Sequence, residues 1–353
     1  MENPMNQFRV SPLPDLEQPF RTGVCGWMGS DCAFSLPLKN NRVLWLFGDT
    51  IVKDDAFSDS RKNTQIINNS VGIQHGDLIT EKSPLRFYWD QSGGDHRSFF
   101  KDDACSGFIW PFTATLLWNR LYVFTLRMIQ PDIAKVFGFR QIGTEIYLIS
   151  NPEETPDQWI VRRYELPWRR GLGTFGTYVT RFENHLYIYG FRKDGISWFR
   201  NLKFIVARVD IAEEKNIINT THWEYLSSPA GKWSQESRDA IGVFDNSTTE
   251  FSVHYSQTMQ KYVLISHHGK SGQYLSIRLS KTPYGPFSEP ATIYEFPDPQ
   301  WSSDYFCYAA KAHPELAEND NEIIVTYMTN SKDLSDLYKD LRVYYPRFLK
   351  IQF

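Results

Sequence analysis

The sequence has little of what marks several common classes of protein. Only four of its 353 residues are cysteines: Cys25, Cys32, Cys105 and Cys307. They have neither CxxC spacing nor companion histidines at zinc-ligand spacing, so we expect no structural zinc site. A disulfide between Cys25 and Cys32 is the alternative in an oxidising compartment, and four buried free thiols are our expectation.

Charge of one sign and long apolar runs are also missing. The 38 basic residues are scattered and outnumbered by 41 acidic ones, which argues against a nucleic-acid partner. No stretch approaches the ~20 consecutive apolar residues of a membrane span. The N-terminal residues lack the apolar core of a signal peptide. The chain as given therefore reads as cytoplasmic, with a secreted or periplasmic location as the alternative if an export signal was removed.

Helical periodicity is nearly absent. Only Asp132–Val136 and Ser331–Leu341 predict a turn or two of helix. Aromatic residues, in contrast, make up 16% of the chain. They pack well on pleated sheets, and their flat apolar faces also stack on sugar rings. The remaining sequence consists of short apolar or alternating runs between Gly, Pro, Asn and Asp, the pattern of many short strands.

One pattern recurs five times: small or polar residues, a short turn, and a strand that ends in aromatic or aliphatic residues. The copies are Ser35–Phe47, Thr113–Phe124, Tyr178–Tyr189, Ser252–Ile265 and Ala309–Tyr327, which start roughly 60–80 residues apart. Each is followed by one or two further strands. This period predicts an all-β, five-bladed β-propeller with about four antiparallel strands per blade. We expect a single domain over residues 1–353, with the first ~20 residues extended or part of the closing blade. A pair of β-sandwiches is the alternative.

The first repeat carries a pair of aspartates. Asp31 precedes one apolar strand, and Asp49 follows the run Leu44–Phe47. If the turn at Asn40–Asn41 is a three-residue loop, Asp31 lies directly opposite Asp49 on the same face. With a two-residue loop the two side chains point to opposite faces. We favour the three-residue loop, because it puts both carboxylates at the open end of the hairpin.

Two carboxylates at one channel mouth are what glycoside hydrolysis requires. One protonates the leaving oxygen, and the other activates water or attacks carbon. We therefore name Asp31 and Asp49 as candidate catalytic residues, the competing interpretation being a turn residue and a strand cap. Glu250 opens the fourth repeat, and we expect it at the same mouth as an acid, a base or a substrate-orienting residue.

Residues at other strand starts are candidates for substrate binding. Aromatic candidates for sugar subsites are Trp110, Phe175 and Tyr308, and candidate hydrogen-bond donors are Asn69 and Arg347. His254 is a further candidate for substrate binding, and one of His254, His267 and His268 is a candidate for tuning a carboxylate or a bound ion. Nothing in the sequence calls for a metal ion or another cofactor.

Several of these segments resemble a known family. The strings Gly29–Asp31, Ser35–Leu38 and Leu44–Thr50 resemble the opening blade of propellers first grouped as domain of unknown function 4185 and now associated with glycoside hydrolase family 183, the endo-D-arabinanases. The resemblance extends to Glu250–Tyr255, Ser280–Ser288, Tyr308–Glu315 and Tyr345–Phe348. It implies hydrolysis of a furanosidic or similar glycan, with Asp31 and Asp49 as the acid/base pair.

We therefore expect a glycoside hydrolase whose partner is an oligo- or polysaccharide substrate. The alternative is a non-catalytic glycan-binding propeller in which the same residues hold sugar hydroxyls. A protein-interaction scaffold is a third reading, and it gives no reason for paired carboxylates at a channel mouth.

Overall fold

Antiparallel strands make up most of the described chain, as the alternating runs predict. The computed structural model describes residues 8–21, 25–54, 60–76, 85–102, 107–131, 138–167, 172–193 and 202–353. Helix in these ranges is confined to α1 (Pro14–Arg21), α2 (Lys215–Ile218), α3 (Asp336–Lys339) and short 3-10 turns. None of these helices is long and apolar enough to cross a lipid bilayer. The predicted all-β class is confirmed.

The strands of the described residues form six sheets. The first contains β3 (Phe34–Leu38), β4 (Arg42–Phe47), β7 (Ser70–His75) and β8 (Leu85–Tyr88). The second contains β9 (Phe108–Leu117), β10 (Arg120–Ile129), β11 (Arg140–Ile149) and β12 (Val161–Leu166). The third contains β13 (Thr174–Phe182), β14 (His185–Lys193), β15 (Leu202–Asp210), β16 (Trp223–Ser228) and β17 (Lys232–Ser234).

The later sheets follow the same antiparallel order. The fourth contains β18 (Ser252–Ser256), β19 (Lys261–His268), β20 (Tyr274–Ser280) and β21 (Ala291–Glu295). The fifth contains β22 (Tyr305–Ala312), β23 (Glu322–Ser331), β24 (Arg347–Gln352) and β1 (Arg9–Pro12), so the first and last strands of the chain pair with each other. The sixth contains β2 (Trp27–Ser30), β5 (Thr50–Val52) and β6 (Gln65–Ile67).

The five predicted repeats coincide with the first two strands of the first five sheets. The sixth sheet and the fifth strand of the third sheet were not predicted. The helical turn expected within Ser331–Leu341 is α3, whereas Asp132–Val136 lies outside the described residues. Cys25 is exposed, and Cys25, Cys32 and Cys307 are all free, so neither the Cys25–Cys32 disulfide nor four buried thiols is found.

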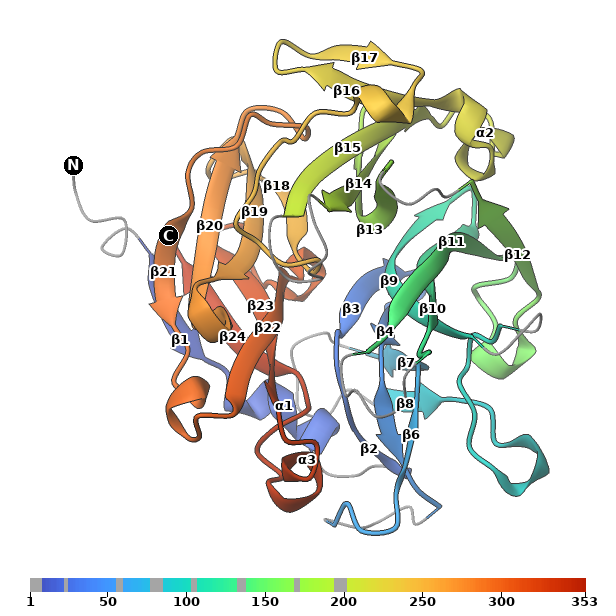
Figure 1. Cartoon of the computed structure of the whole chain (residues 1–353), viewed down its shortest axis with the longest axis vertical. Coiled ribbons are helices and arrows are strands. Elements are labelled where there is room, and N and C mark those ends of the chain that lie inside the picture. Colours follow the sequence, from blue (N-terminus) through green and yellow to red (C-terminus); the bar gives the residue numbers. More distant parts are fainter. Residues whose placement is uncertain are drawn as a thin grey trace.

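The first strands of consecutive sheets lie side by side. β3 contacts β9, β9 contacts β13, β13 contacts β18, and β18 contacts β22. The fifth sheet returns to the first through a hydrogen bond from the Tyr308 hydroxyl to Asp31. Figure 1 shows the sheets succeeding one another around the molecule in chain order, from blue through green and yellow to red.

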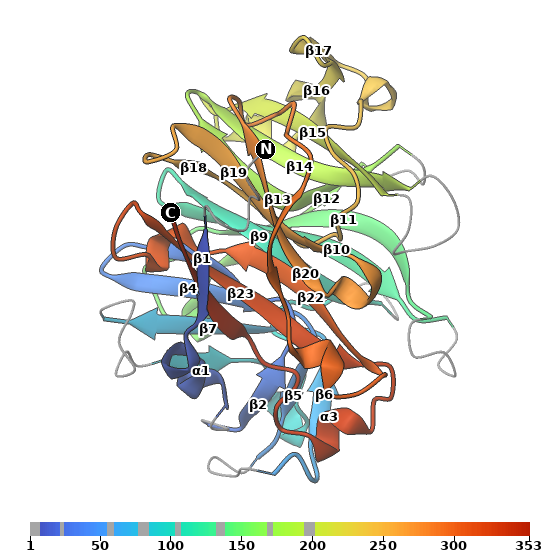
Figure 2. The ribbon, with the colours of Figure 1, turned by 90° about the vertical axis from the view of Figure 1, so that its left-hand side faces the viewer.

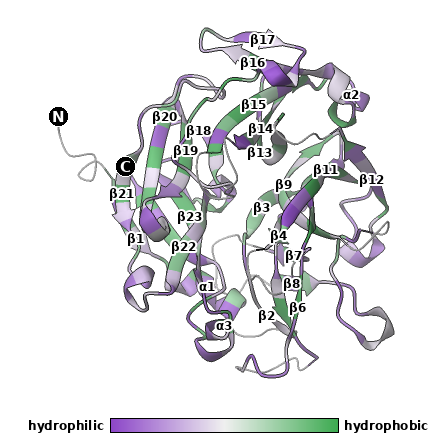
Figure 3. Cartoon of the chain, in the orientation of Figure 1, coloured by the Kyte–Doolittle hydropathy of each residue, from purple (hydrophilic) through white to green (hydrophobic). Residues whose placement is uncertain are grey.

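Five apolar clusters fill the spaces between consecutive sheets, because each sheet has two faces to bury. They lie between the first and second, second and third, third and fourth, and fourth and fifth sheets. A fifth cluster joins the last sheet to the first. Figure 3 shows apolar residues along the inner strands and polar ones on outer strands such as β12. The apolar core is therefore divided into separate clusters, which lie between the sheets in the order of the sheets along the chain.

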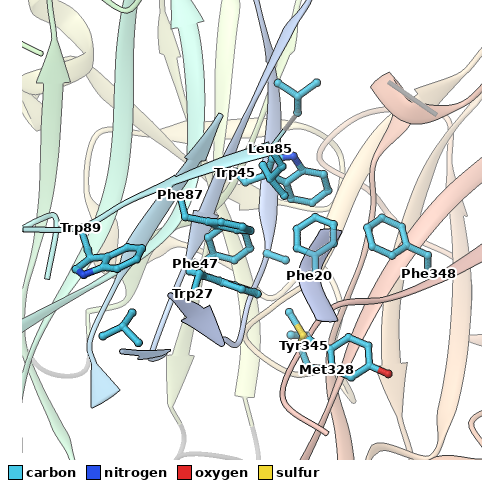
Figure 4. Packing of buried hydrophobic residues seen from close by; sticks show 14 of the residues in the cluster. Phe20, Trp27, Trp45, Phe47, Leu85, Phe87, Trp89, Met328, Tyr345 and Phe348 are labelled. Carbon is cyan, nitrogen blue, oxygen red and sulfur yellow. The ribbon is translucent and has the colours of Figure 1, made fainter. Parts of the chain in front are cut away.

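The cluster between the fifth and first sheets includes a side chain from the N-terminal helix. Phe20 of α1 is 3% exposed, and its ring centroid lies 5.2 Å from that of Trp45 and 5.6 Å from that of Phe348. Figure 4 shows Phe20 between the aromatic side chains of the first sheet and Phe348. Through Phe20, helix α1 near the start of the chain thus packs against both the first sheet and Phe348 near its end.

The sixth sheet lies at one end of the molecule together with α3, as Figures 1 and 2 both show. The buried Arg61 holds the two together, because its guanidinium donates to the backbone oxygens of Met28, Leu337 and Val343 at 2.8–2.9 Å. This end carries the start of β3 and therefore the candidate site.

Replacing Phe20 tests the contribution of this cluster to stability. We expect Phe20→Ala to lower the free energy of unfolding by about 3–5 kcal/mol, because a large buried ring leaves a cavity between two sheets. Phe182→Ala is the control, since Phe182 is 37% exposed, and it should cost less than about 1 kcal/mol. Urea denaturation at neutral pH measures both. Equal losses in the two variants would contradict a closing role for Phe20.

Candidate active site

Asp31 and Asp49 are paired through their backbones. Strands β3 and β4 are joined by the three-residue loop 39–41, in which Leu38 pairs with Arg42, so the predicted loop length is confirmed. The backbone N–H of Asp31 donates to the carbonyl oxygen of Asp49 at 3.1 Å. Beyond this point Ser30 pairs with Thr50 in the same register. The two aspartates therefore occupy an interruption in one long hairpin, between its two sheets.

The corner at this interruption is tightly built. Cys32 and Ala33 adopt left-handed backbone conformations, with φ of 70° and 56°. A Cβ atom on Gly48 would lie 2.2 Å from Oδ1 of Asp31. Glycine at position 48 thus leaves the space that the Asp31 carboxyl group occupies.

Side chains from neighbouring sheets hold the two carboxyl groups. Oδ1 of Asp49 accepts hydrogen bonds from Nε1 of Trp110 at 2.9 Å and from Nδ2 of Asn68 at 3.2 Å. Oδ2 of Asp31 accepts from the Tyr308 hydroxyl at 3.3 Å. Oδ1 of Asp31 is buried and has no hydrogen-bond partner among the described residues. Asp49 is thus held by two donors, whereas Asp31 keeps one oxygen unpaired.

Glu250 reaches the same place from the residues before β18. Its negative charge acts on Asp31, and hydroxyl groups of Thr248 and Thr249 bond to its carboxyl group. The Thr248 hydroxyl also lies 3.3 Å from Nδ1 of the buried His267. Asp31, Asp49 and Glu250 are each partly exposed as residues.

Burial raises the pKa of each carboxyl group in the cluster. The pKa of Asp31 lies well above its usual range because of burial and the negative charges of Asp49 and Glu250. Burial raises the pKa of Asp49 to about 6, against the opposing effect of its two donors Trp110 and Asn68. The pKa of Glu250 is raised by burial and lowered in part by Lys311. Near neutral pH, Asp49 is therefore ionised, whereas the pKa of Asp31 is raised by its two negative neighbours as well as by burial.

Two predicted binding residues, Trp110 and Tyr308, lie at the site, and their contact with a substrate stays a prediction. Trp110 donates to Asp49, and its ring stacks edge-on with Phe139 at 4.7 Å between centroids. Tyr308 donates to Asp31 and accepts from Nδ2 of Asn330 at 3.4 Å. Both aromatics are partly exposed, so each retains a surface for a ligand.

Asn69 does not fit its predicted role as a substrate donor, whereas the role of Arg347 stays a prediction. Asn69 is fully buried, and its Nδ2 donates to the backbone oxygens of Phe100 and Ile109, both at 2.9 Å. Arg347 is partly exposed, and its Nε lies 2.8 Å from Oδ1 of the buried Asp298 as an ion pair.

Phe175 and His254 are both partly exposed, and their contact with a substrate stays a prediction. The pairing of β13 with β14 shifts next to Phe175, whose ring packs on Trp223 and Tyr225 in the core between the second and third sheets. His254 is partly exposed, and burial lowers its pKa to about 4, so it is neutral near pH 7. Nothing that the structure describes links it to the carboxyl groups, and its role in binding stays a prediction.

Three contributors to the site were not predicted: Asn68, Lys311 and Tyr344. Asn68 is the neighbour of the residue that we chose, and nothing local distinguishes the two. Tyr344 is buried near both aspartates, whose charges help burial to raise its pKa. Lys311 carried a signal, because a lysine within Ala309–Ala312 interrupts a run of small apolar residues. Among the described residues, no three His, Cys, Asp or Glu side chains are grouped so as to hold a metal ion.

The family of the chain is defined by a match over nearly its whole length. Residues 17–353 match the family described as Domain of unknown function (DUF5005), and the chain belongs to this family. No curated protein matches the sequence. The narrower assignment to glycoside hydrolase family 183 is not shown by this match.

Solved structures share the fold. A protein from Bacteroides ovatus, provisionally named a hydrolase, has 19% identity and a TM-score of 0.76 over 98% of this chain and 90% of that one. A Dyadobacter fermentans protein of unknown function has 9% identity and a TM-score of 0.51, covering 98% and 99% of the two chains. The GH43 β-xylosidase/α-arabinofuranosidase CoXyl43 from a compost microbial metagenome has 12% identity and a TM-score of 0.51, covering 98% and 94%. At such identities the similarity shows a common fold alone.

The raised pKa of Asp49 makes stability depend on pH. Between its ordinary value of 3.8 and about 6, the folded state binds more protons than the unfolded state, so stability falls as pH rises through this window. We expect the free energy of unfolding of Asp49→Asn to fall less than that of the wild type between pH 4 and pH 6, by about 2 kcal/mol. Urea denaturation across this range measures the difference. Asp304→Asn, at an exposed position, should follow the wild type, and a parallel profile for Asp49→Asn would contradict the raised pKa.

Proposed function

We propose that the protein is a glycoside hydrolase that acts on a furanosidic, arabinan-like or related glycan. The observation that carries this proposal is the carboxyl cluster, in which two paired aspartates have raised pKa values and different hydrogen-bond partners. Different surroundings of two carboxyl groups are how enzymes obtain an acid and a base at one pH. The provisional hydrolase and the GH43 enzyme that share the fold support the same class of reaction.

The fold proposed for this function is a five-bladed β-propeller. The five sheets of four or five strands would be the blades, and the cyclic order of their apolar clusters supports this reading. The sixth, three-stranded sheet would then be an extension of the first blade that frames the channel mouth. Residues 1–353 would form one domain, with β1 in the closing blade.

The residues divide into roles according to their charge. Asp31, whose pKa is raised by burial and by two negative neighbours, donates a proton to the leaving glycosidic oxygen. Asp49, ionised and held by Trp110 and Asn68, attacks the anomeric carbon or activates water. Glu250, in ionised form, orients sugar hydroxyls and favours the protonated form of Asp31.

The reaction is tested with arabinan, arabinogalactan, xylan and their oligosaccharides. We expect Asp31→Asn and Asp49→Asn to lower kcat by about 10²–10⁴-fold, since each removes a proton-transfer or attacking group. Glu250→Gln should have a smaller effect, and Asp304→Asn should leave turnover unchanged. Product release is measured by chromatography. Equal activity in all variants would overturn the catalytic assignment, and binding without turnover in the wild type would favour a glycan-binding propeller instead.

A second variant tests the space for the Asp31 carboxyl group. In Gly48→Ala the new Cβ would lie 2.2 Å from Oδ1 of Asp31, so the carboxyl group must move. We expect turnover to fall at least tenfold. Gly143→Ala is the matched control, because its Cβ would meet Arg127 at an ordinary 3.6 Å. Unchanged turnover in Gly48→Ala would show that the position of Asp31 does not matter.

A further inference from the structure

A lysine is buried beside the carboxyl cluster. Lys311 of β22 is 1% exposed. Its Nζ atom donates to the backbone oxygens of Ala309, at 2.8 Å, and Cys32, and lies 4.5 Å from the centroid of the Phe34 ring. A buried ammonium group is costly unless hydrogen bonds and opposite charges compensate for lost solvation. Its retention here needs a reason beyond packing.

We propose that Lys311 is a positioning residue of the candidate active site, which fixes the backbone that carries Asp31 and places a positive charge beside the carboxyl cluster. This inference rests on the proposed function, because it assigns a role within that site. Lys311 does not touch the substrate, since its buried amine is already bound to two carbonyl groups.

The hydrogen bonds of Lys311 bridge two strained segments. Cys32 and Ala33 on one side and Ala309 on the other have left-handed backbone conformations, with φ of 70°, 56° and 56°. Such conformations cost residues with a Cβ of order 1 kcal/mol each and persist only where the surroundings hold them. The ammonium group of Lys311 stabilises both segments, because it links the carbonyl groups of Cys32 and Ala309. The position of Asp31 next to Cys32 therefore depends on it.

Lys311 carries the positive charge among the titratable groups that surround it. The titratable groups that interact electrostatically with Lys311 are Asp31, Cys32, Glu250, His267 and His313. Burial, together with the charge of Lys311, lowers the pKa of His267 to about 3 and that of His313 well below its usual range. Both histidines are thus neutral, and so is the Cys32 thiol, whose pKa burial raises.

The charge of Glu250 raises the pKa of Lys311, and the charge of Lys311 lowers the pKa of Glu250. Burial lowers the pKa of Lys311 to about 8, while Cys32, Glu250 and Asp31 counteract this effect. The positive charge in turn lowers the pKa of Glu250 against the effect of burial. Without the ammonium group, Glu250 takes up its proton at a higher pH, and the ionised form that orients the substrate is lost earlier on acidification.

The test is a carboxyl ¹³C NMR titration of Glu250, whose signal is identified by its loss in Glu250→Gln. We expect Lys311→Met to move the midpoint to higher pH, and Lys311→Arg, which keeps the charge, to stay closer to the wild type. The acidic limb of the kcat profile should move in the same direction. Lys350→Met is the matched control on β24, where Lys350 pairs with Glu322 at 3.5 Å. An unmoved Glu250 midpoint in Lys311→Met would overturn the proposal.

A second titration leaves Lys311 in place, in case its replacement prevents folding. The amine of Lys311 is followed by ¹⁵N NMR in the wild type and in Glu250→Gln. We expect its midpoint to fall in the variant, because the stabilising negative charge is gone, and an unchanged midpoint would overturn the coupling. Neither titration requires a substrate. Absence of turnover on every glycan would therefore remove the proposed function while the titrations still decide the role of Lys311.

Discussion

The backbone pairing of Asp31 with Asp49 is the constraint on which the site depends. The hairpin keeps one register through β3 and β4 and into the adjoining pair β2 and β5. The two carboxyl groups therefore come from short bends held between paired strands, which restricts their separation. The interruption at Cys32 and Ala33 leaves the carboxyl groups at the junction of two sheets.

The electrostatics of the site follow from its burial between several sheets. Burial raises the pKa of each carboxyl group, and donors from other sheets oppose this effect to different degrees: Trp110 from β9, Tyr308 and Lys311 from β22. The different hydrogen-bond surroundings of the Asp31 and Asp49 carboxyl groups thus require that the first, second and fifth sheets stay together. Phe20 packs in the cluster between the fifth and first sheets, so it helps to hold together the sheets that carry the site residues.

The sequence predicted those features that local residues decide. The inner hairpins and the opposition of Asp31 to Asp49 follow from alternation and from turn residues within about 20 positions. Long-range contacts were not predictable in this way. Asn68, rather than Asn69, reaches Asp49, because Asn69 is bound to the backbone of Phe100 and Ile109, which are distant in sequence. Arg347 is bound by Asp298 from a distant turn, and the three- and four-residue strands of the sixth sheet are too short to show a period.

The most direct test of the acid/base assignment is a carboxyl ¹³C titration of Asp31 and Asp49 in the wild type, with each signal identified by its loss in the Asn variant. The pair titrates as a coupled unit. The structure predicts one step near pH 6, carried mainly by Asp49, and a step of Asp31 that is also raised above the ordinary range of aspartate by burial and by the charges of Asp49 and Glu250. Two steps near pH 4, the ordinary range for aspartate, would contradict the assignment.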